Sequence, residues 1–126
     1  MAMTNYLEDK LLEAVVKNTS YTTPTTVYMA LYSTAPGEAG GGTELSGDNY
    51  SRAAMTFGSS SGGTITTTAD ITFATASGDW ATAVAIGIVD ASSGGNLLFY
   101  KSIAGRSVKS GSALTIVSGD ITLTLD

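Results

Sequence analysis

The sequence predicts a mainly β protein: a single-domain antiparallel β-sandwich, jelly-roll-like, of about seven or eight strands with one N-terminal α-helix. Short segments that alternate apolar and polar residues are separated by Gly- and Ser-rich turns, at spacings typical of sandwiches and barrels. Only one segment has helical periodicity, and it precedes all the strands. A chain of 126 residues suits one domain, here residues 1–126, which would bury roughly two-thirds of its unfolded surface.

The helix is predicted over residues 5–18, NYLEDKLLEAVVKN. Asn5 is the expected N-cap, and Glu8 follows at the capping-box position. One apolar stripe is predicted, widened by Leu12 and made of Leu7, Leu11, Ala14 and Val15. Two arrangements follow: the stripe packs on the domain's own sheet, or the helix is an arm that packs on a neighbouring subunit.

The first strong strand is predicted over residues 26–32. Large side chains occupy both of its faces, so we expect it to be covered on both sides. One face carries Val27, Met29 and Leu31, and the other carries Tyr28 and Tyr32.

Residues 35–49, APGEAGGGTELSGDN, form the longest irregular segment and contain five glycines. A phosphate-binding loop would need Lys and then Ser or Thr after its last glycine, whereas Thr43 and Glu44 follow Gly42. The acidic residues of this segment lack calcium-loop spacing. The pattern favours a flexible contact loop.

A central hairpin is predicted over residues 80–103. Its first strand alternates bulky residues with a nearly bare face that contains Gly87, so a second layer could approach that face closely. Asp90 is expected to end this strand by bonding to backbone N–H groups of the following turn. Its second strand is expected over residues 97–100, and further short strands are expected over residues 50–57, 64–68, 70–74, 114–117 and 121–125.

The composition excludes several classes of protein. Charged residues make up 13 % of the chain, which carries a net charge of −5. The six Lys and Arg residues form no patch, which argues against nucleic-acid binding. No segment is apolar enough for a membrane helix, and the acidic residues near the N-terminus do not fit a signal peptide. The weak charge leaves little repulsion between copies, which suits repeated assembly.

The residues available for chemistry predict that the protein is not an enzyme and holds no metal or cofactor. The chain has neither His nor Cys, so the commonest general base and the thiol nucleophile are missing. A carboxylate pair is available in principle, but Asp79, Asp90 and Asp120 stand at turns or strand ends, where bonding to the backbone explains them. Exposed aromatic rings could instead bind a carbohydrate, with Tyr28, Tyr32, Tyr50 and Trp80 as candidates.

Several stretches, in order over nearly the whole chain, resemble a family of small bacteriophage virion proteins that are often labelled tail-fibre proteins. They are NYLEDKLL, YTTPTTVYMALYSTAPGEAG, TELSGDNYSRAAMTFG, TADITF, GIVDASSGGNLLFYKSI and DITLTLD. The resemblance implies a structural role in the virion and no catalytic residues.

A compact chain without a repeat or a coiled coil favours a capsid decoration (cement) protein over a fibre shaft. The expected partners are the major capsid protein and copies of the chain itself, for example as a trimer. The alternatives are a tail or fibre-associated protein and a carbohydrate-binding module. The expected contacts lie in the helix and the Gly-rich loop: Leu7, Leu11, Glu38, Gly40, Gly41, Gly42, Glu44 and Leu45.

Overall fold

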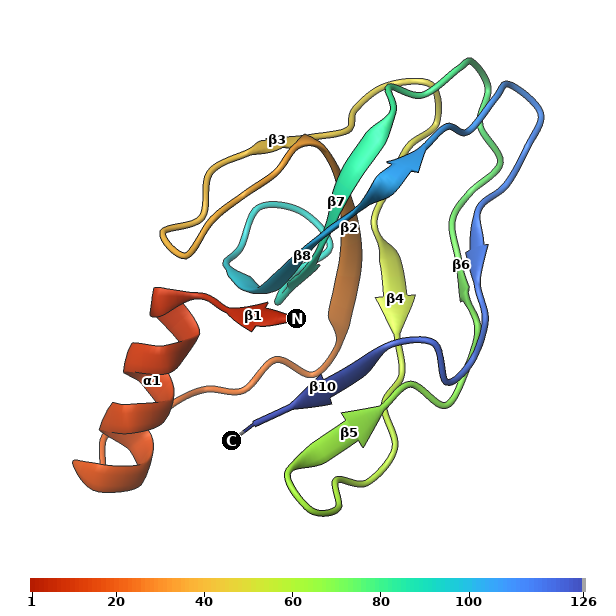
Figure 1. The fold of residues 1–126 in the computed structure, drawn as a ribbon. Coiled ribbons are helices and arrows are strands. Elements are labelled where there is room, and N and C mark those ends of the chain that lie inside the picture. The colour runs from red at the N-terminus through yellow and green to blue at the C-terminus, as the bar shows by residue number, and fades with distance from the viewer. Residues whose placement is uncertain (126) are drawn as a thin grey trace.

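The structure is a computed structural model that describes residues 1–125, and it confirms the mainly β, antiparallel class with one N-terminal helix. Within these residues the chain forms one helix and ten strands (Figure 1). They are β1 (Ala2–Met3), α1 (Asn5–Val16), β2 (Val27–Thr34), β3 (Thr43–Glu44), β4 (Ala53–Met55), β5 (Thr64–Thr66), β6 (Ile71–Thr72), β7 (Ala83–Val89), β8 (Leu97–Arg106), β9 (Thr115–Ile116) and β10 (Thr122–Thr124).

One layer is a six-stranded antiparallel sheet with the order β1-β8-β7-β2-β3. Strand β4 pairs with the first half of β2, and β3 pairs with its second half. The predicted hairpin is therefore central, because β7 lies between β8 and β2. Strand β1 was not predicted; its two residues pair with the outer edge of β8.

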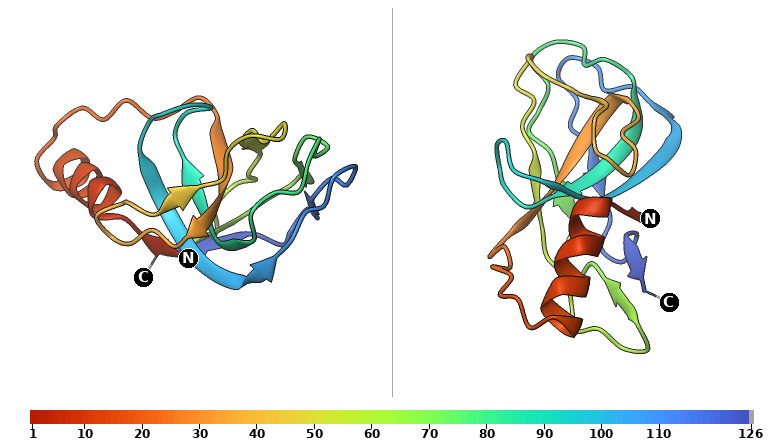
Figure 2. Two further views of the ribbon diagram at one scale, coloured as in Figure 1. Left: turned by 90° about the horizontal axis from the view of Figure 1, so that it is seen from above. Right: turned by 90° about the vertical axis from the view of Figure 1, so that its left-hand side faces the viewer.

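The second layer consists of two ribbons, β5–β10 and β6–β9. Threonine hydroxyls face each other across the first ribbon, in the pairs Thr64–Thr124 and Thr66–Thr122. Seen from above, the large sheet lies between helix α1 on one side and these ribbons on the other (Figure 2). The sandwich thus has one broad layer and one narrow layer.

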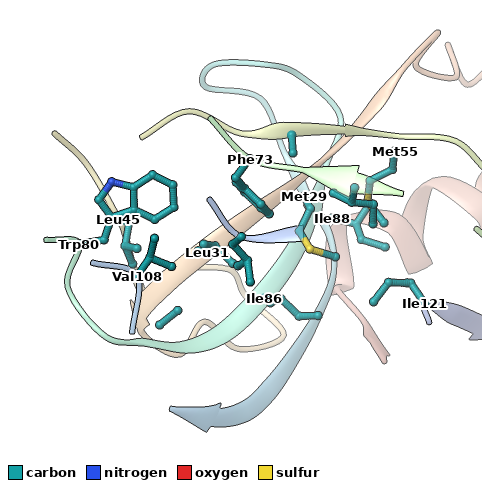
Figure 3. Packing of buried hydrophobic residues seen from close by; sticks show 14 of the residues in the cluster. Met29, Leu31, Leu45, Met55, Phe73, Trp80, Ile86, Ile88, Val108 and Ile121 are labelled. Carbon is teal, nitrogen blue, oxygen red and sulfur yellow. The ribbon is translucent and has the colours of Figure 1, made fainter. Parts of the chain in front are cut away.

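The main core fills the space between the two layers (Figure 3). The large sheet contributes Met29, Leu31, Ile86 and Ile88, and the opposite layer contributes Ile71, Phe73, Ile121 and Leu123. Burial of these apolar side chains supplies the main driving force for folding. The predicted alternation of β2 is confirmed, since Met29 and Leu31 point to this core and Tyr32 packs on the other face of the sheet. In the last strand Ile121 and Leu123 point to the core as predicted, whereas Leu125 is exposed.

The bare face of β7 is covered differently from the prediction. A methyl group at Gly87 would lie 2.6 Å from Leu97 Cδ1 and 2.9 Å from Tyr32 Cε2. Large side chains of the neighbouring strands β8 and β2 therefore fold over Gly87, so the close approach comes from the same sheet instead of a second layer.

Helix α1 begins at Asn5 as predicted and ends at Val16, two residues before the predicted end, but its N-cap lies one residue earlier than predicted. Thr4, not Asn5, is the N-cap: its hydroxyl oxygen accepts a hydrogen bond from the Leu7 N–H at 3.5 Å. The same hydroxyl donates to the Leu97 carbonyl at 2.6 Å. Pairing of β1 with β8 brings Thr4 next to the Leu97 carbonyl, which is why Thr4 and not Asn5 caps the helix.

Candidate functional site

The first turn of α1 and the Gly-rich segment, which are far apart in sequence, meet at one end of the molecule. The Asn5 N–H donates a 3.0 Å hydrogen bond to the carbonyl of Glu38. Together with the tip of the β7–β8 hairpin they line a cavity of about 440 Å³. We call its rim the loop–helix surface, which consists of Asn5, Tyr6, Glu38–Gly41 and Gly94–Asn96.

The Gly-rich segment is a defined hairpin, which corrects the prediction of an irregular loop. Its tip closes through two reciprocal backbone hydrogen bonds between Gly37 and Gly40, both 2.9 Å long. Gly42 has φ +77°, and a side chain there would meet the Thr34 carbonyl oxygen at 2.6 Å and the Pro36 nitrogen at 2.7 Å. Only glycine fits this backbone and this space. The segment therefore presents Glu38, Gly40 and Gly41 in a fixed geometry.

Not all of the eight predicted contact residues lie on the surface. Glu38, Gly40 and Gly41 line the cavity, and Leu11 is half-buried on the helix. Leu7 and Leu45 are buried within the domain, so their side chains support the two segments from inside. Val15, predicted to lie in the packed stripe, is 80 % exposed, because α1 is buried only at Leu7.

An ion pair beneath the loop–helix surface was missed by sequence reasoning. Arg52 Nε lies 2.8 Å from Glu44 Oε2, and Arg52 Nη2 lies 2.8 Å from Glu44 Oε1. Arg52 Nη1 donates to the carbonyls of Ala91 and Gly94 at 2.8 and 2.7 Å. One guanidinium thus ties strand β3 and the β7–β8 tip to the segment before β4. Its hydrogen bond to Glu44 is the main cause that raises the pKa of Arg52.

Tyr50 extends this network into the core. Its hydroxyl accepts from the Leu31 N–H at 3.0 Å and donates to Glu44 Oε2 at 3.1 Å. Its ring contacts Trp80 edge-on, with centroids 5.4 Å apart, and stacks on Phe73 at 6.4 Å. Burial is the largest cause that raises the pKa of the Tyr50 hydroxyl. The signal available in the sequence was an Arg and a Tyr two residues apart in an alternating segment, but their partner could not be read from it.

The aromatic residues considered for carbohydrate binding do not form an exposed platform. Trp80 and Tyr32 are each only 6 % exposed. The Trp80 indole N–H donates to the Asp48 carbonyl at 2.9 Å, which fixes the ring in the core. Tyr28 and Tyr50 are half-buried. A sugar-stacking site needs an open ring face, which this arrangement does not offer at Trp80 or Tyr32.

Three carboxylates near strand ends, those of Asp70, Asp79 and Asp90, accept hydrogen bonds from the backbone. Asp90 accepts from the Asn96 N–H at 2.7 Å, as predicted, and Asp79 accepts from the Ser110 N–H at 2.9 Å. The latter bond is the main cause that lowers the pKa of Asp79. Asp70 bonds likewise to the Ser118 N–H at 2.8 Å. Residues 1–125 contain no group of three or more acidic side chains placed to hold a metal ion.

A second exposed feature is the outer face of α1. Leu12 is 63 % exposed, and Val15 and Val16 are each 80 % exposed. They lie on the later turns of the helix, beyond the first turn, where Leu7 is buried. Figure 2 shows the helix at the side of the domain, away from the two ribbons. The part of the chain that the structure describes has no helix long and apolar enough to cross a bilayer.

Comparison with protein families gives one description for nearly the whole chain. The family model for podophage GP4 fiber I protein gp80 matches residues 2–124. A comparison with curated proteins finds no match. The match covers both the helix and the β-layers, so it includes every element of the loop–helix surface.

Proposed function

Since the chain belongs to the podophage GP4 fiber I protein gp80 family, a family of phage fibre structural proteins and not a known class of enzyme, we propose that it is a non-catalytic component of a virion fibre or of its attachment site. The family match over residues 2–124 carries this proposal. Of the positions expected from the sequence, the tail or fibre-associated one agrees with the family description.

The loop–helix surface is our candidate for the contact with neighbouring virion proteins. It combines backbone groups of the Gly-rich segment with the exposed side chains of Asn5, Glu38 and Asn96. The Arg52–Glu44 pair fixes the segments beneath it, so little conformational freedom is lost on binding. Copies of the chain itself are proposed as further neighbours, in a homo-oligomer such as a trimer, with the apolar face of α1 at the subunit contact.

Decoration of the head shell is the second candidate. It is favoured by the absence from the sequence of any repeat or heptad that could build a shaft. In that case the partner would be the major capsid protein. Binding to the assembled lattice would stabilise it by mass action, multiplied over many copies.

The copy number of the chain in purified virions separates the two positions. We would measure it by quantitative mass spectrometry against the major capsid protein, with a known tail protein as the internal standard. A fibre component should occur at a few copies per hundred capsid subunits. A ratio near one to one would instead support decoration of the shell. Absence from the particle would contradict both.

A further inference from the structure

The exposed face of α1 is both apolar and acidic. Leu12, Val15 and Val16 carry its exposed apolar side chains. Glu8 and Asp9 are exposed as well, and they precede Leu12 by four and three residues, so they are its neighbours on the helix surface. We call these five residues the α1 outer face. An apolar surface of this kind, open to water in the single chain, is typical of a contact with another protein.

The lysines of this part of the chain lie away from the α1 outer face. With 3.6 residues per turn, Lys10 and Lys17 project from the opposite side of the helix. The Lys10 Nζ lies 5.9 Å from the centre of the Tyr6 ring. The α1 outer face therefore carries only negative charge beside its apolar side chains.

An apolar groove lies open in another part of the molecule, between β8 and the narrow layer. It consists of two adjoining cavities of about 410 and 290 Å³, which share the lining residues Ile86, Ile103 and Ile116. Ile103 and Ile116 are only half-buried, although both pack against the main core. An apolar segment seated in the groove would remove these two side chains from water, which is favourable.

Two exposed cations border the groove. Lys101 lines the larger cavity and Arg106 lines the smaller one. Within residues 1–125 neither forms an ion pair. Asp120 is the one carboxylate among the described lining residues, and it lines the cavity of Lys101. The groove therefore carries an excess of positive charge, which is least compensated at Arg106.

Helix α1 cannot reach the groove of its own copy. Met1 lines the groove, and strand β1 runs from there toward α1 (Figure 1). At the far end of β1, the Thr4 N–H donates to the Leu98 carbonyl at 2.9 Å, and the Asn5 N–H donates to the Glu38 carbonyl at 3.0 Å. These bonds fix the first turn of the helix. Both apolar surfaces therefore stay open in the single chain.

Two α1 outer faces do not suit each other. In an antiparallel pair centred on Leu12, Glu8 would lie against Val16 of the second copy and Asp9 against Val15, with no cation on either face to pair with these carboxylates. Burial of unpaired charges is costly. In a parallel pair each carboxylate would face its own equivalent, and like charges repel. The groove, in contrast, offers both an apolar lining and cations.

We propose that the groove binds helix α1 of a second copy of this chain. The apolar side chains of the α1 outer face, spaced i, i+3 and i+4, lie on Ile103 and Ile116, as an amphipathic helix lies in an apolar groove. Its carboxylates lie toward Arg106, because Asp120 borders the other end. The contact joins two different surfaces, so it closes either as a reciprocal dimer or as a ring such as a trimer. The inference rests on the proposed self-association and names the surface that receives the helix.

Single cysteines test which surfaces meet, since the chain has no cysteine of its own. L12C places a thiol on the α1 outer face. A104C places one at the groove, where Ala104 is exposed and lines the smaller cavity. The two variants are mixed in equal amounts and oxidised mildly. We expect the mixed disulfide to form at least about tenfold faster than either symmetric one, because only the mixed pair is held in proximity. T72C, on an exposed residue of β6, is the control for A104C and should show no such excess.

Charge reversal tests the specificity of the contact. Self-association is measured by sedimentation equilibrium of the full chain at concentrations up to about 1 mM, so that weak contacts are detected. The K101E/R106E variant should raise the dissociation constant at least about tenfold, because two attractions become repulsions. Addition of E8K/D9K to it should recover most of this loss. All four side chains are exposed, so the fold should tolerate these changes.

The K10E/K17E variant is the matched control for charge. It changes the net charge by the same amount as K101E/R106E, but on the opposite side of α1, and should keep the wild-type dissociation constant. An equal loss in both variants would show general repulsion between copies and would overturn the proposal.

Two further results would overturn it. One is a chain that stays monomeric up to about 1 mM and gives no excess of the mixed disulfide. The other is a symmetric L12C disulfide that forms faster than the mixed one, because the outer faces of two helices would then meet. Neither result bears on the presence of the chain in the virion, which the copy number in purified particles measures separately.

Discussion

Arg52 and Glu44 form a two-pronged ion pair that joins three separate segments at one end of the molecule. Both Nε–Oε2 and Nη2–Oε1 are 2.8 Å long, and the side chains are only 11 % and 26 % exposed. A pair with this geometry, in which the guanidinium also donates to two carbonyls, contributes more than a surface ion pair.

Replacement of Arg52 should destabilise the fold. The R52A variant leaves Glu44 without its partner and leaves the Ala91 and Gly94 carbonyls without their donor. We expect the free energy of unfolding to fall by about 2–3 kcal/mol in urea titrations. R52K keeps the charge but cannot bond in two prongs, and should recover less than half of this loss. A loss below about 0.5 kcal/mol for R52A would show that the network is not structural.

The glycine hairpin offers a matched pair of substitutions. Gly41 and Gly42 have similar φ angles, +79° and +77°, but only at Gly42 would a side chain meet the backbone. G41A should cost about 1 kcal/mol for the left-handed conformation alone. G42A should cost at least about 1 kcal/mol more, because Thr34 and Pro36 must move. If G41A and G42A lower the free energy of unfolding in urea by the same amount, the hairpin backbone can move away from a side chain at Gly42 without a further loss of stability.

Thr4 should be important for docking of the helix. Its side chain is 1 % exposed, caps α1 and bonds to β8. T4V keeps the shape but removes both hydrogen bonds, and should cost about 2 kcal/mol in unfolding experiments. T4S keeps the hydroxyl and serves as the control. If both variants unfold at the wild-type urea concentration, the cap does not hold the helix in place.

Stability should fall at alkaline pH because of Tyr50. The folded state raises the pKa of this hydroxyl above its ordinary value near 10, mainly through burial. The folded protein therefore binds the phenolic proton more tightly than the unfolded chain does. The resulting stability is complete below about pH 10 and is lost as the pH rises further. Burial raises the pKa of Tyr32 in the same direction.

The Y50F variant tests this assignment. It should be less stable than wild type by about 1 kcal/mol at pH 8, because the bonds to Leu31 and Glu44 are lost. Between about pH 10 and 11.5 its free energy of unfolding should then decline less steeply than that of wild type. If the free energies of unfolding of Y50F and wild type decline equally steeply with pH, groups other than Tyr50 cause the loss of stability at alkaline pH.

The loop–helix surface should matter for incorporation into virions and little for folding. Glu38 and Asn96 are exposed, so E38R and N96R should change the free energy of unfolding by less than about 0.5 kcal/mol. Incorporation of these variants, measured by mass spectrometry of complemented particles, should fall several-fold. E13R, on the exposed part of α1 away from this surface, is the control. Deletion of Gly40–Gly42 should also reduce incorporation, and wild-type incorporation of all variants would exclude this surface.

Local patterns in the sequence were sufficient for much of the fold. The period of two predicted the buried faces correctly in β2, over Ala85–Val89 of the central hairpin and at Ile121 and Leu123 of the last strand, because side-chain alternation is a property of the strand itself. It failed where Ala83, and not Val84, packs in the main core and where Leu125 is exposed. The helical period of its apolar residues also predicted the helix correctly. It did not predict that Thr4 is the N-cap or that most of the apolar stripe is exposed. Leu12 and Val15 belong to the apolar stripe predicted from the sequence, yet both are exposed because α1 is buried only at Leu7.

The sequence by itself therefore determined the mainly β class, the single N-terminal helix, the place of the central hairpin and the resemblance to a phage structural family. Only the tertiary structure decided which distant segments meet. It set the Arg52 guanidinium against Glu44 and the tip of the β7–β8 hairpin, it brought the Gly-rich hairpin to the first turn of α1, and it left an apolar groove open between β8 and the narrow layer. These relationships depend on strand order and on the angle between layers, which are set by packing across the whole core and not by any local run of residues.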